Sequence, residues 1–206
     1  MIKIVACHMR LTLVHILLLC TVSTYAQMNQ EVLKIGDAID EIELPNPYGQ
    51  IIDIASEVDK GICIIFTNHQ CNYALLYLDR IIHLESKFSE EGIKFVLVES
   101  RIESFEGSVE SLEQFIPEKN VNIEYLIDID NTLSKRFGAQ SSPHAFLFRK
   151  KEDDLILTYS GSIDNNSRKP ERVTKTYLSD AIQSVLLKNE LIKSETKAIG
   201  CFIDKG

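Results

Sequence analysis

The sequence contains no tryptophan, few cysteines and fewer basic than acidic residues. Among its 206 residues are 5 Cys, 5 Pro and 9 Gly, with 22 Lys and Arg against 30 Asp and Glu. A formal net charge of −8 excludes the basic surface that general nucleic-acid binding requires. So few cysteines exclude a small scaffold held by many disulfides, and so little Gly and Pro exclude a fibrous or low-complexity chain. We expect a globular protein of one domain, with or without extensions.

The N-terminal segment has the pattern of a secretory signal peptide. Lys3 and Arg10 form a basic start, the apolar run Leu11–Val22 follows, and small residues end at Ala26. A basic start, a short apolar core and small residues before a cleavage site are the features that signal peptides share. The sequence therefore predicts cleavage before Gln27.

Two other interpretations of this segment are weaker. A permanent membrane anchor needs ~20 apolar residues, more than this run supplies. A lipid anchor at Cys20 needs a small residue before it, where the sequence has Leu19. We predict an exported protein, periplasmic or secreted, with no membrane association after cleavage. Residues 1–26 are its signal peptide, 27–190 its domain and 191–206 a C-terminal tail.

Strand-like and helix-like segments alternate along the rest of the chain. The apolar runs Gly61–Thr67 and Ile93–Val98 are typical of parallel strands buried on both faces, and apolar residues at helical spacing predict a helix over Asn72–Phe88. The remaining predicted elements are a hairpin of Glu41–Leu44 with Gln50–Ile54, helices Ser108–Ile116, Thr132–Phe137 and Val173–Leu187, a strand Ile123–Ile127, and a hairpin of Ala145–Arg149 with Leu155–Ser160. This order predicts an α/β fold with a mixed central sheet, helices on both faces and an N-terminal hairpin.

Cys71 is the cysteine best placed for chemistry. It follows the strand Gly61–Thr67 and lies at the start of the helix that runs to Phe88. Backbone N–H groups at a helix N-terminus stabilise a thiolate, and the carboxyl end of a parallel strand opens into the crevice where α/β proteins bind ligands. The alternative is a buried structural cysteine, which the polar neighbours disfavour. Cys63, surrounded by isoleucines, is expected in the core.

Three further residues are candidates for the same site. Cys201 lies in the apolar stretch AIGCFI of the tail and is either a resolving thiol for Cys71, a partner in an intermolecular disulfide or an incidental thiol at a frayed end. Pro143 enters a strand, and composition leaves open whether its peptide bond is cis or trans. His69 either favours the Cys71 thiolate or is an exposed loop residue. We expect no metal or cofactor, since no zinc-ligand spacing or phosphate-binding loop is present.

The chain resembles the redoxin proteins of the alkyl hydroperoxide reductase/thiol-specific antioxidant family, in particular a peroxiredoxin-like subgroup with the thioredoxin fold. The segments that carry the resemblance are LKIGDAIDEIELPNPYGQ, FTNHQCNY, GIKFVLV, YLIDIDNTLSKRFGAQSSPHAFLF, YSGSID and AIGCFI. It implies a thioredoxin-like fold, Cys71 as the active-site thiol and Pro143 as a cis-proline beside it. Arg80 matches an arginine that recurs on this helix in the subgroup.

The chain departs from the motifs of these proteins around Cys71. No second cysteine completes a Cys-x-x-Cys motif, and Asn68 stands where peroxiredoxins carry Thr or Ser. His69 and Asn72 replace the Asn and Pro of the subgroup's Asn-x-Cys-Pro. These replacements weaken both standard mechanisms.

Two functions from different classes remain. The first is an exported thiol oxidoreductase, exchanging disulfides or reducing peroxides through Cys71, with a protein or small-molecule thiol, disulfide or peroxide as partner. The second is a non-catalytic thioredoxin-like binding module. In the first, Cys201 is the candidate resolving thiol, and the candidate substrate-binding residues are Asn68, His69, Arg80 and Pro143.

Overall fold

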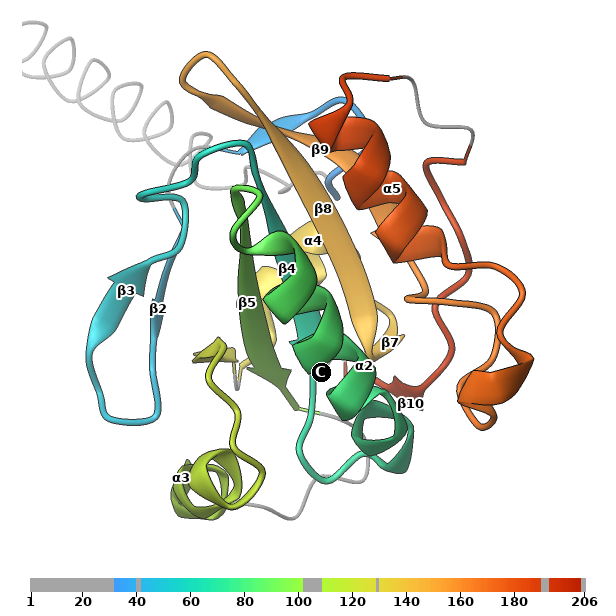
Figure 1. The fold of residues 1–206 in the computed structure, drawn as a ribbon. Helices are drawn as coiled ribbons and strands as arrows, with labels where there is room; N and C mark the ends of the chain where they lie inside the picture. Colours follow the sequence, from blue (N-terminus) through green and yellow to red (C-terminus); the bar gives the residue numbers. More distant parts are fainter. Residues whose placement is uncertain (1–31, 40–41, 102–108, 129, 190–192, 205–206) are drawn as a thin grey trace, which may run out of the picture. The chain divides into compact units, whose positions relative to one another are not determined.

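The computed structural model describes residues 32–39, 42–101, 109–128, 130–189 and 193–204; the predicted signal peptide lies outside these residues. A six-stranded mixed sheet occupies the centre, in the order β1-β9-β8-β4-β5-β6 (Figure 1). β4, β5 and β6 pair in parallel, whereas β8 is antiparallel to both β4 and β9. The strands are β1 (Ala38–Ile39), β4 (Gly61–Thr67), β5 (Ile93–Ser100), β6 (Glu124–Asp128), β8 (His144–Lys151) and β9 (Asp154–Gly161).

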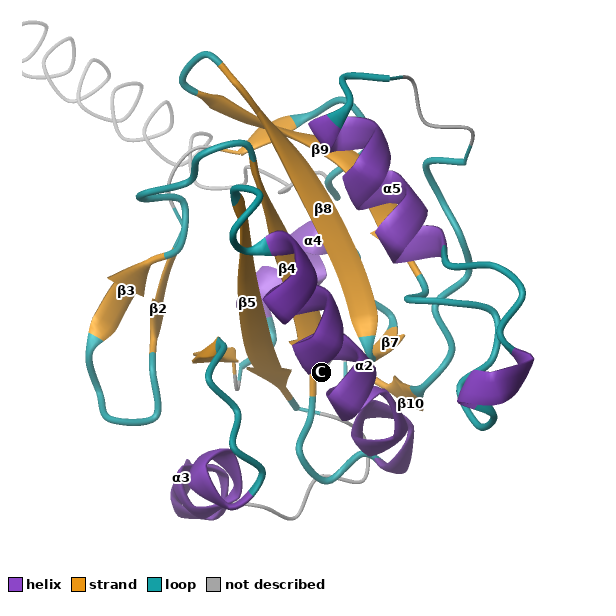
Figure 2. Cartoon of the chain, in the orientation of Figure 1, coloured by secondary structure: helices purple, strands orange, loops and turns teal. Residues whose placement is uncertain are grey.

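Helices cover both faces of this sheet (Figure 2). On one face, α2 (Asn72–Phe88) and α5 (Tyr177–Leu186) pack over β4 and β8. On the other face lies α4 (Thr132–Phe137). Alternate residues of β4 enter the two cores, because successive side chains of a strand point to opposite faces. Cys63 and Ile65 join the α2 and α5 side, whereas Ile62, Ile64 and Phe66 join the α4 side.

The structure confirms several predicted elements with their bounds. β4, α2 and α4 begin and end where the pattern places them. α4 ends at Gly138, whose φ of 68° is the left-handed conformation that glycine adopts freely. The predicted N-terminal hairpin is formed by β2 (Glu43–Pro45) and β3 (Ile51–Asp53), which pair antiparallel.

Two helix predictions were wrong at one end. α5 begins at Tyr177 rather than Val173, because the Asn165 side chain accepts hydrogen bonds from the N–H groups of Thr174 and Lys175 and holds that segment out of the helix. α3 (Val109–Glu118) continues past Pro117. A proline in the last turn removes only its own N–H bond, and the amides that follow still reach Phe115 and Ile116.

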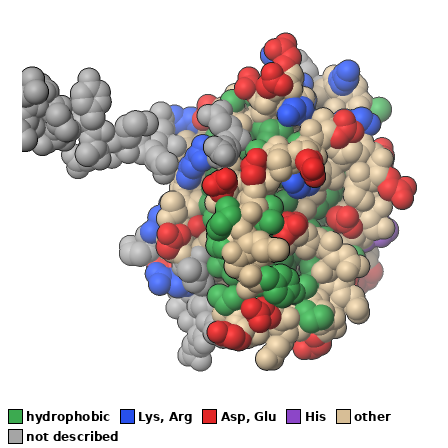
Figure 3. Space-filling view, turned by 90° about the vertical axis from the view of Figure 1, so that its left-hand side faces the viewer, with side chains coloured by type: hydrophobic (Ala, Val, Ile, Leu, Met, Phe, Trp, Pro, Cys, Tyr) green, Lys and Arg blue, Asp and Glu red, His purple; other side chains and the backbone are tan. Residues whose placement is uncertain are grey.

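The hairpin presents exposed hydrophobic side chains at the side of the molecule. Figure 3 views that side, and hydrophobic side chains gather in the middle of the face. Tyr48 in the turn and Ile51 in β3 are 66% and 62% exposed. Among the described residues, no helix has the length and apolar character needed to cross a membrane.

Candidate active site

Cys71 is the N-cap residue of helix α2, immediately before its first turn. Its backbone is extended and the helix begins with Asn72. Its N–H group donates a hydrogen bond to the Asn68 carbonyl at 3.0 Å. The side chain of Asn68, which is fully buried, donates to the Ser100 carbonyl and accepts from the Gln70 N–H. Asn68 therefore shapes the turn between β4 and α2 that sets the position of Cys71.

Cys71 is joined to Cys201 by a disulfide bond. Their Cα atoms are 6.0 Å apart, across 130 residues of sequence. Cys71 is 1% exposed, whereas Cys201 is half-buried. The tail cysteine is therefore the sulfur that an external thiol reaches more easily.

A loop with a cis-proline lies against both cysteines. The Ser142–Pro143 peptide bond is cis, and the Cys71 Sγ lies 3.2 Å from the Ser142 carbonyl oxygen. The short strand β10 (Cys201–Phe202) pairs antiparallel with β7 (Ser141–Ser142), which places Cys201 opposite Ser142. Three segments distant in sequence thus converge: the start of α2, the cis-proline loop and the tail.

The tail is anchored to the domain on both sides of Cys201. Before it, the Thr196 hydroxyl bonds to the Tyr159 hydroxyl and to the Ser162 N–H. After it, Ile203 is buried in the core beside α4, and the Asp204 N–H donates to the Arg101 carbonyl. The structure therefore shows a docked segment in which Cys201 is held at Cys71, rather than a frayed end with an incidental thiol.

The sequence matches the profile of a known protein family. A sequence profile of the AhpC/TSA family matches residues 35–153, more than half of the chain. The chain belongs to this family. No curated protein matches it.

Solved structures share the fold of this AhpC/TSA family member. A hypothetical protein of Sinorhizobium meliloti 1021 is 21% identical with a TM-score of 0.74, covering 85% of this chain and 98% of that one. The peroxidoxin BcpB of Mycobacterium tuberculosis is 16% identical with a TM-score of 0.57, covering 79% and 99%. A secreted M. tuberculosis disulfide oxidoreductase is 17% identical with a TM-score of 0.50, covering 71% and 95%. These similarities confirm the predicted thioredoxin-like fold.

His69 belongs to a buried polar network beside the site. Its Nδ1 lies 2.7 Å from Glu99 Oε1, and its Nε2 lies 2.8 Å from the Ser111 hydroxyl. Glu99 also accepts a hydrogen bond from the Tyr125 hydroxyl. Burial, and then the nearby Glu99 carboxylate, raise the pKa of Tyr125. His69 is therefore not the exposed loop residue of the alternative interpretation, and it links the turn before Cys71 to β5 and α3.

Sequence reasoning missed Glu99 and Tyr125 as members of this site. Both are almost fully buried. A carboxylate is rarely buried without partners. The position of Glu99 directly after the apolar run Ile93–Val98 was therefore the one sign in the sequence of a buried polar network. Its partners come from other segments and could be identified only in the folded chain.

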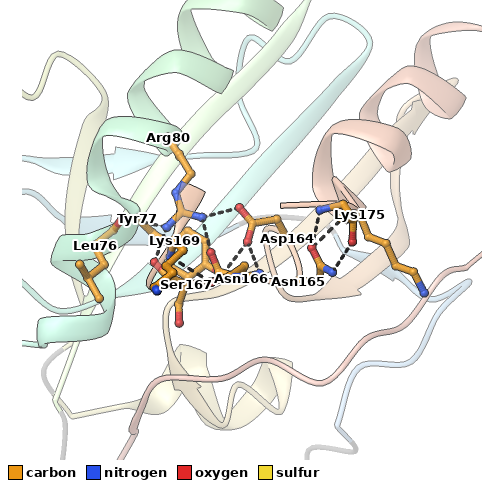
Figure 4. Close-up of polar contacts among 10 residues, drawn as sticks. Leu76, Tyr77, Arg80, Asp164, Asn165, Asn166, Ser167, Lys169 and Lys175 are labelled. Carbon is orange, nitrogen blue, oxygen red and sulfur yellow. Dashed lines mark hydrogen bonds and ion pairs between the residues drawn. The ribbon is translucent and has the colours of Figure 1, made fainter. Parts of the chain in front are cut away.

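Arg80 holds a loop that follows β9 (Figure 4). Its guanidinium pairs with Asp164 at 2.5 Å and donates to the carbonyls of Asn166 and Ser167. The Tyr77 hydroxyl donates to the other oxygen of Asp164. The contacts of Arg80 are those of a positioning residue, because they are made within the protein and not toward the disulfide.

Cys63 and His144 are buried for structural reasons. Burial raises the pKa of the Cys63 thiol, which keeps it protonated and unreactive. His144, next to Pro143, accepts from the Gln140 N–H through Nδ1 and bonds to the Ser160 hydroxyl through Nε2. Burial lowers the pKa of His144 to about 4. No group of His, Cys, Asp and Glu suited to a metal occurs among the described residues.

Proposed function

We propose that this chain is an exported thiol oxidoreductase in which Cys71 and Cys201 form the redox pair. The observation that carries the proposal is the disulfide between Cys71, the N-cap residue of α2, and Cys201 in the anchored tail. Membership of the AhpC/TSA family and the shared fold support it, since two structural neighbours are named as a disulfide oxidoreductase and a peroxidoxin. The basic, apolar and small-residue pattern of residues 1–26 supports export.

Reduction of the disulfide proceeds in two exchanges. An external thiolate attacks Cys201 Sγ, the more exposed sulfur, and forms a mixed disulfide as the bond to Cys71 breaks. The electron pair stays on the Cys71 sulfur, where the N-terminus of the 17-residue helix α2 stabilises the thiolate. A second external thiolate attacks the external sulfur of the mixed disulfide. The two external molecules leave joined as a disulfide, and Cys201 is released as a thiolate and takes up a proton. Two external thiols are oxidised for each internal disulfide reduced.

Oxidation begins at Cys71. With a disulfide substrate, the Cys71 thiolate forms a mixed disulfide, which Cys201 resolves by displacing the reduced substrate thiol. With a peroxide, the thiolate attacks the O–O bond, giving a sulfenic acid and an alcohol or water. Cys201 then displaces hydroxide, which leaves as water, and the internal disulfide is restored. We favour disulfide substrates because Asn68 replaces the hydroxyl residue of the peroxiredoxin motif.

Single-cysteine variants test the function. We expect Cys71→Ser to abolish turnover with disulfide and peroxide substrates, and Cys201→Ser to leave a slow reaction that depends on added thiol. Cys63→Ser serves as the matched control and retains activity. Undiminished turnover in Cys71→Ser contradicts the thiol mechanism and supports the binding module as the function.

A matched pair of rates separates the two substrate classes. We expect the reduced protein to be oxidised faster by a model peptide disulfide than by hydrogen peroxide, relative to the rates of free cysteine with the same oxidants. The opposite ranking supports peroxide reduction.

For export, we expect the mature protein outside the cytoplasm to begin at Gln27, as read by N-terminal sequencing. Met1 at the N-terminus of that protein contradicts export by cleavage.

A further inference from the structure

A cavity of about 510 Å³ lies between the loop after β9 and the tail segment that leads to Cys201. A volume of this size suits a small organic ligand. Ile199 lines the cavity and is two residues from Cys201, so their Cα atoms are at most about 8 Å apart. Arg168, another lining residue, donates a hydrogen bond to the hydroxyl of Tyr73, and Tyr73 packs against the cluster of Cys71 and Ala74. The lining therefore comes within two residues of Cys201 through Ile199, and Arg168 connects it to a side chain that packs at Cys71.

Three cations line this cavity without a compensating acid. Arg168, Lys193 and Lys197 are exposed, and none of them has a carboxylate partner among the residues that the structure describes. The acid in the lining is Asp164, whose oxygens are taken by Arg80 and the Tyr77 hydroxyl. Glu195 lies between the two lysines in sequence but is not among the lining residues. The cavity is locally positive on a chain with a formal charge of −8.

The loop wall of the cavity is held in place before any ligand arrives. Besides the Arg80 contacts, the Asn166 N–H donates to Asp164, and the Asn166 side chain accepts from the Lys169 N–H (Figure 4). The tail wall is fixed by Thr196 through its bonds to Tyr159 and Ser162. A preformed site loses less conformational entropy on binding than a mobile one.

Aromatic rings complete the lining. Tyr77 and Tyr177 both face the cavity, and the Lys193 ammonium lies 5.4 Å from the centre of the Tyr177 ring. This contact keeps Lys193 beside the wall while leaving its charge available to a ligand. The cavity thus combines positive charge with apolar surface, as an organic anion requires.

We propose that this cavity binds the anionic group of a small thiol, a carboxylate or sulfonate, and so selects anionic thiols as reductants of the Cys71–Cys201 disulfide. This inference rests on the proposed function. The anion binds at Arg168, Lys193 and Lys197, and the thiolate of the same molecule attacks Cys201 Sγ. The Cys71–Cys201 bond breaks and its electron pair stays on Cys71. A second thiol molecule then releases the mixed disulfide as the external disulfide.

Three small thiols of similar length test the selection. The rate of disulfide reduction is measured with 2-mercaptoethanesulfonate, 2-mercaptoethanol and cysteamine, which are anionic, neutral and cationic. Each rate is divided by the rate with a small uncharged reference disulfide, which removes the intrinsic reactivity of the thiol. For the unmodified protein we expect the anionic thiol to be favoured over the cationic one, and the preference to shrink at high salt.

Charge reversal in the cavity supplies the decisive comparison. In Lys193→Glu/Lys197→Glu the anionic preference should fall by about tenfold, since two attractive charges become repulsive. The control Lys150→Glu/Lys151→Glu changes net charge equally at the opposite end of β8 and should keep the preference. Equal preferences in the two double variants overturn the proposal.

An anion without a thiol tests binding to the cavity separately from reduction of the disulfide. 2-(Methylthio)ethanesulfonate carries the anion on a thioether, and NMR shift changes in the oxidised protein report its binding. We expect residues of the cavity to respond in the unmodified protein and not in the cavity variant. Binding without any disulfide reduction contradicts the proposed function alone, whereas reduction by all three thiols with no binding and no charge preference overturns the cavity inference alone.

Discussion

Gly200 passes so close to Ser142 that a β-carbon at residue 200 would overlap the Ser142 carbonyl oxygen. The carbonyl belongs to the cis peptide bond with Pro143, and the next residue of the tail is Cys201. Glycine is therefore required for the tail to bring its cysteine to the α2 N-terminus, since backbone atoms cannot move aside as a flexible side chain can.

The substitution Gly200→Ala should weaken the disulfide. Relieving the overlap should cost about 1–3 kcal/mol, which lowers the equilibrium constant for disulfide formation by a factor of about 5 to 150. The measurement is the fraction of reduced protein across a series of thiol–disulfide buffers. Gly49→Ala is the control, because a β-carbon at Gly49 meets no heavy atom within 4 Å and any strain from the positive φ of Gly49 arises in the hairpin turn, not in the tail. An unchanged equilibrium in Gly200→Ala contradicts the close approach.

Cys63 should be inert in the native protein. It is fully buried in β4, and burial raises the pKa of its thiol, so both access and ionisation oppose its reaction. In reduced protein that lacks residues 1–26, a thiol reagent followed by mass mapping should label Cys201, the more exposed cysteine of the pair, rapidly, and Cys63 only after unfolding. Rapid labelling of Cys63 in the folded protein contradicts its placement.

His144 should make stability depend on pH below neutrality. Its pKa falls from 6.5 to about 4 in the folded protein, so the unfolded chain binds the proton more readily. The contribution of neutral His144 to the free energy of unfolding is fully present above pH 6.5. It is lost as the pH falls toward 4, by about 3 kcal/mol in total. Urea unfolding at a series of pH values measures the loss.

The variant His144→Gln isolates this contribution from the other titrating groups. It should be less stable than the unmodified protein at pH 7, because the histidine hydrogen bonds are changed, and its stability should fall less between pH 6.5 and 4. Parallel pH curves for the two proteins would show that His144 is not the group responsible.

Arg80 should stabilise the loop without taking part in the chemistry. Arg80→Lys should lower the free energy of unfolding by about 2 kcal/mol, because a lysine cannot reproduce the forked contacts to Asp164 and two carbonyls. The rate of disulfide reduction by the neutral 2-mercaptoethanol should stay within about twofold, since the sulfurs are untouched. The exposed Arg172→Lys is the control and should change neither quantity. A lost reduction rate in a folded Arg80→Lys protein would make Arg80 a substrate-binding residue.

The local sequence pattern was sufficient to predict the secondary structure around the site. Uninterrupted apolar residues define β4, helical periodicity defines α2, and Gly138 ends α4, because each of these signals acts between neighbours in sequence. The same reasoning placed Cys71 at a helix start and separated it from Cys63 within the strand. It failed at the start of α5, where the Asn165 side chain competes for the backbone N–H groups that the helix would have used.

The sequence by itself determined the class of fold, the elements that carry Cys71 and the presence of a second cysteine in an apolar stretch of the tail. Only the tertiary structure decided that Cys201 pairs with Cys71, that Glu99 holds His69, that Arg80 supports a loop, and that Arg168, Lys193 and Lys197 line one cavity. Periodicity and capping depend on residues a few positions apart, whereas these relationships join segments 25 or more residues apart, which meet only when the sheet and the tail pack together.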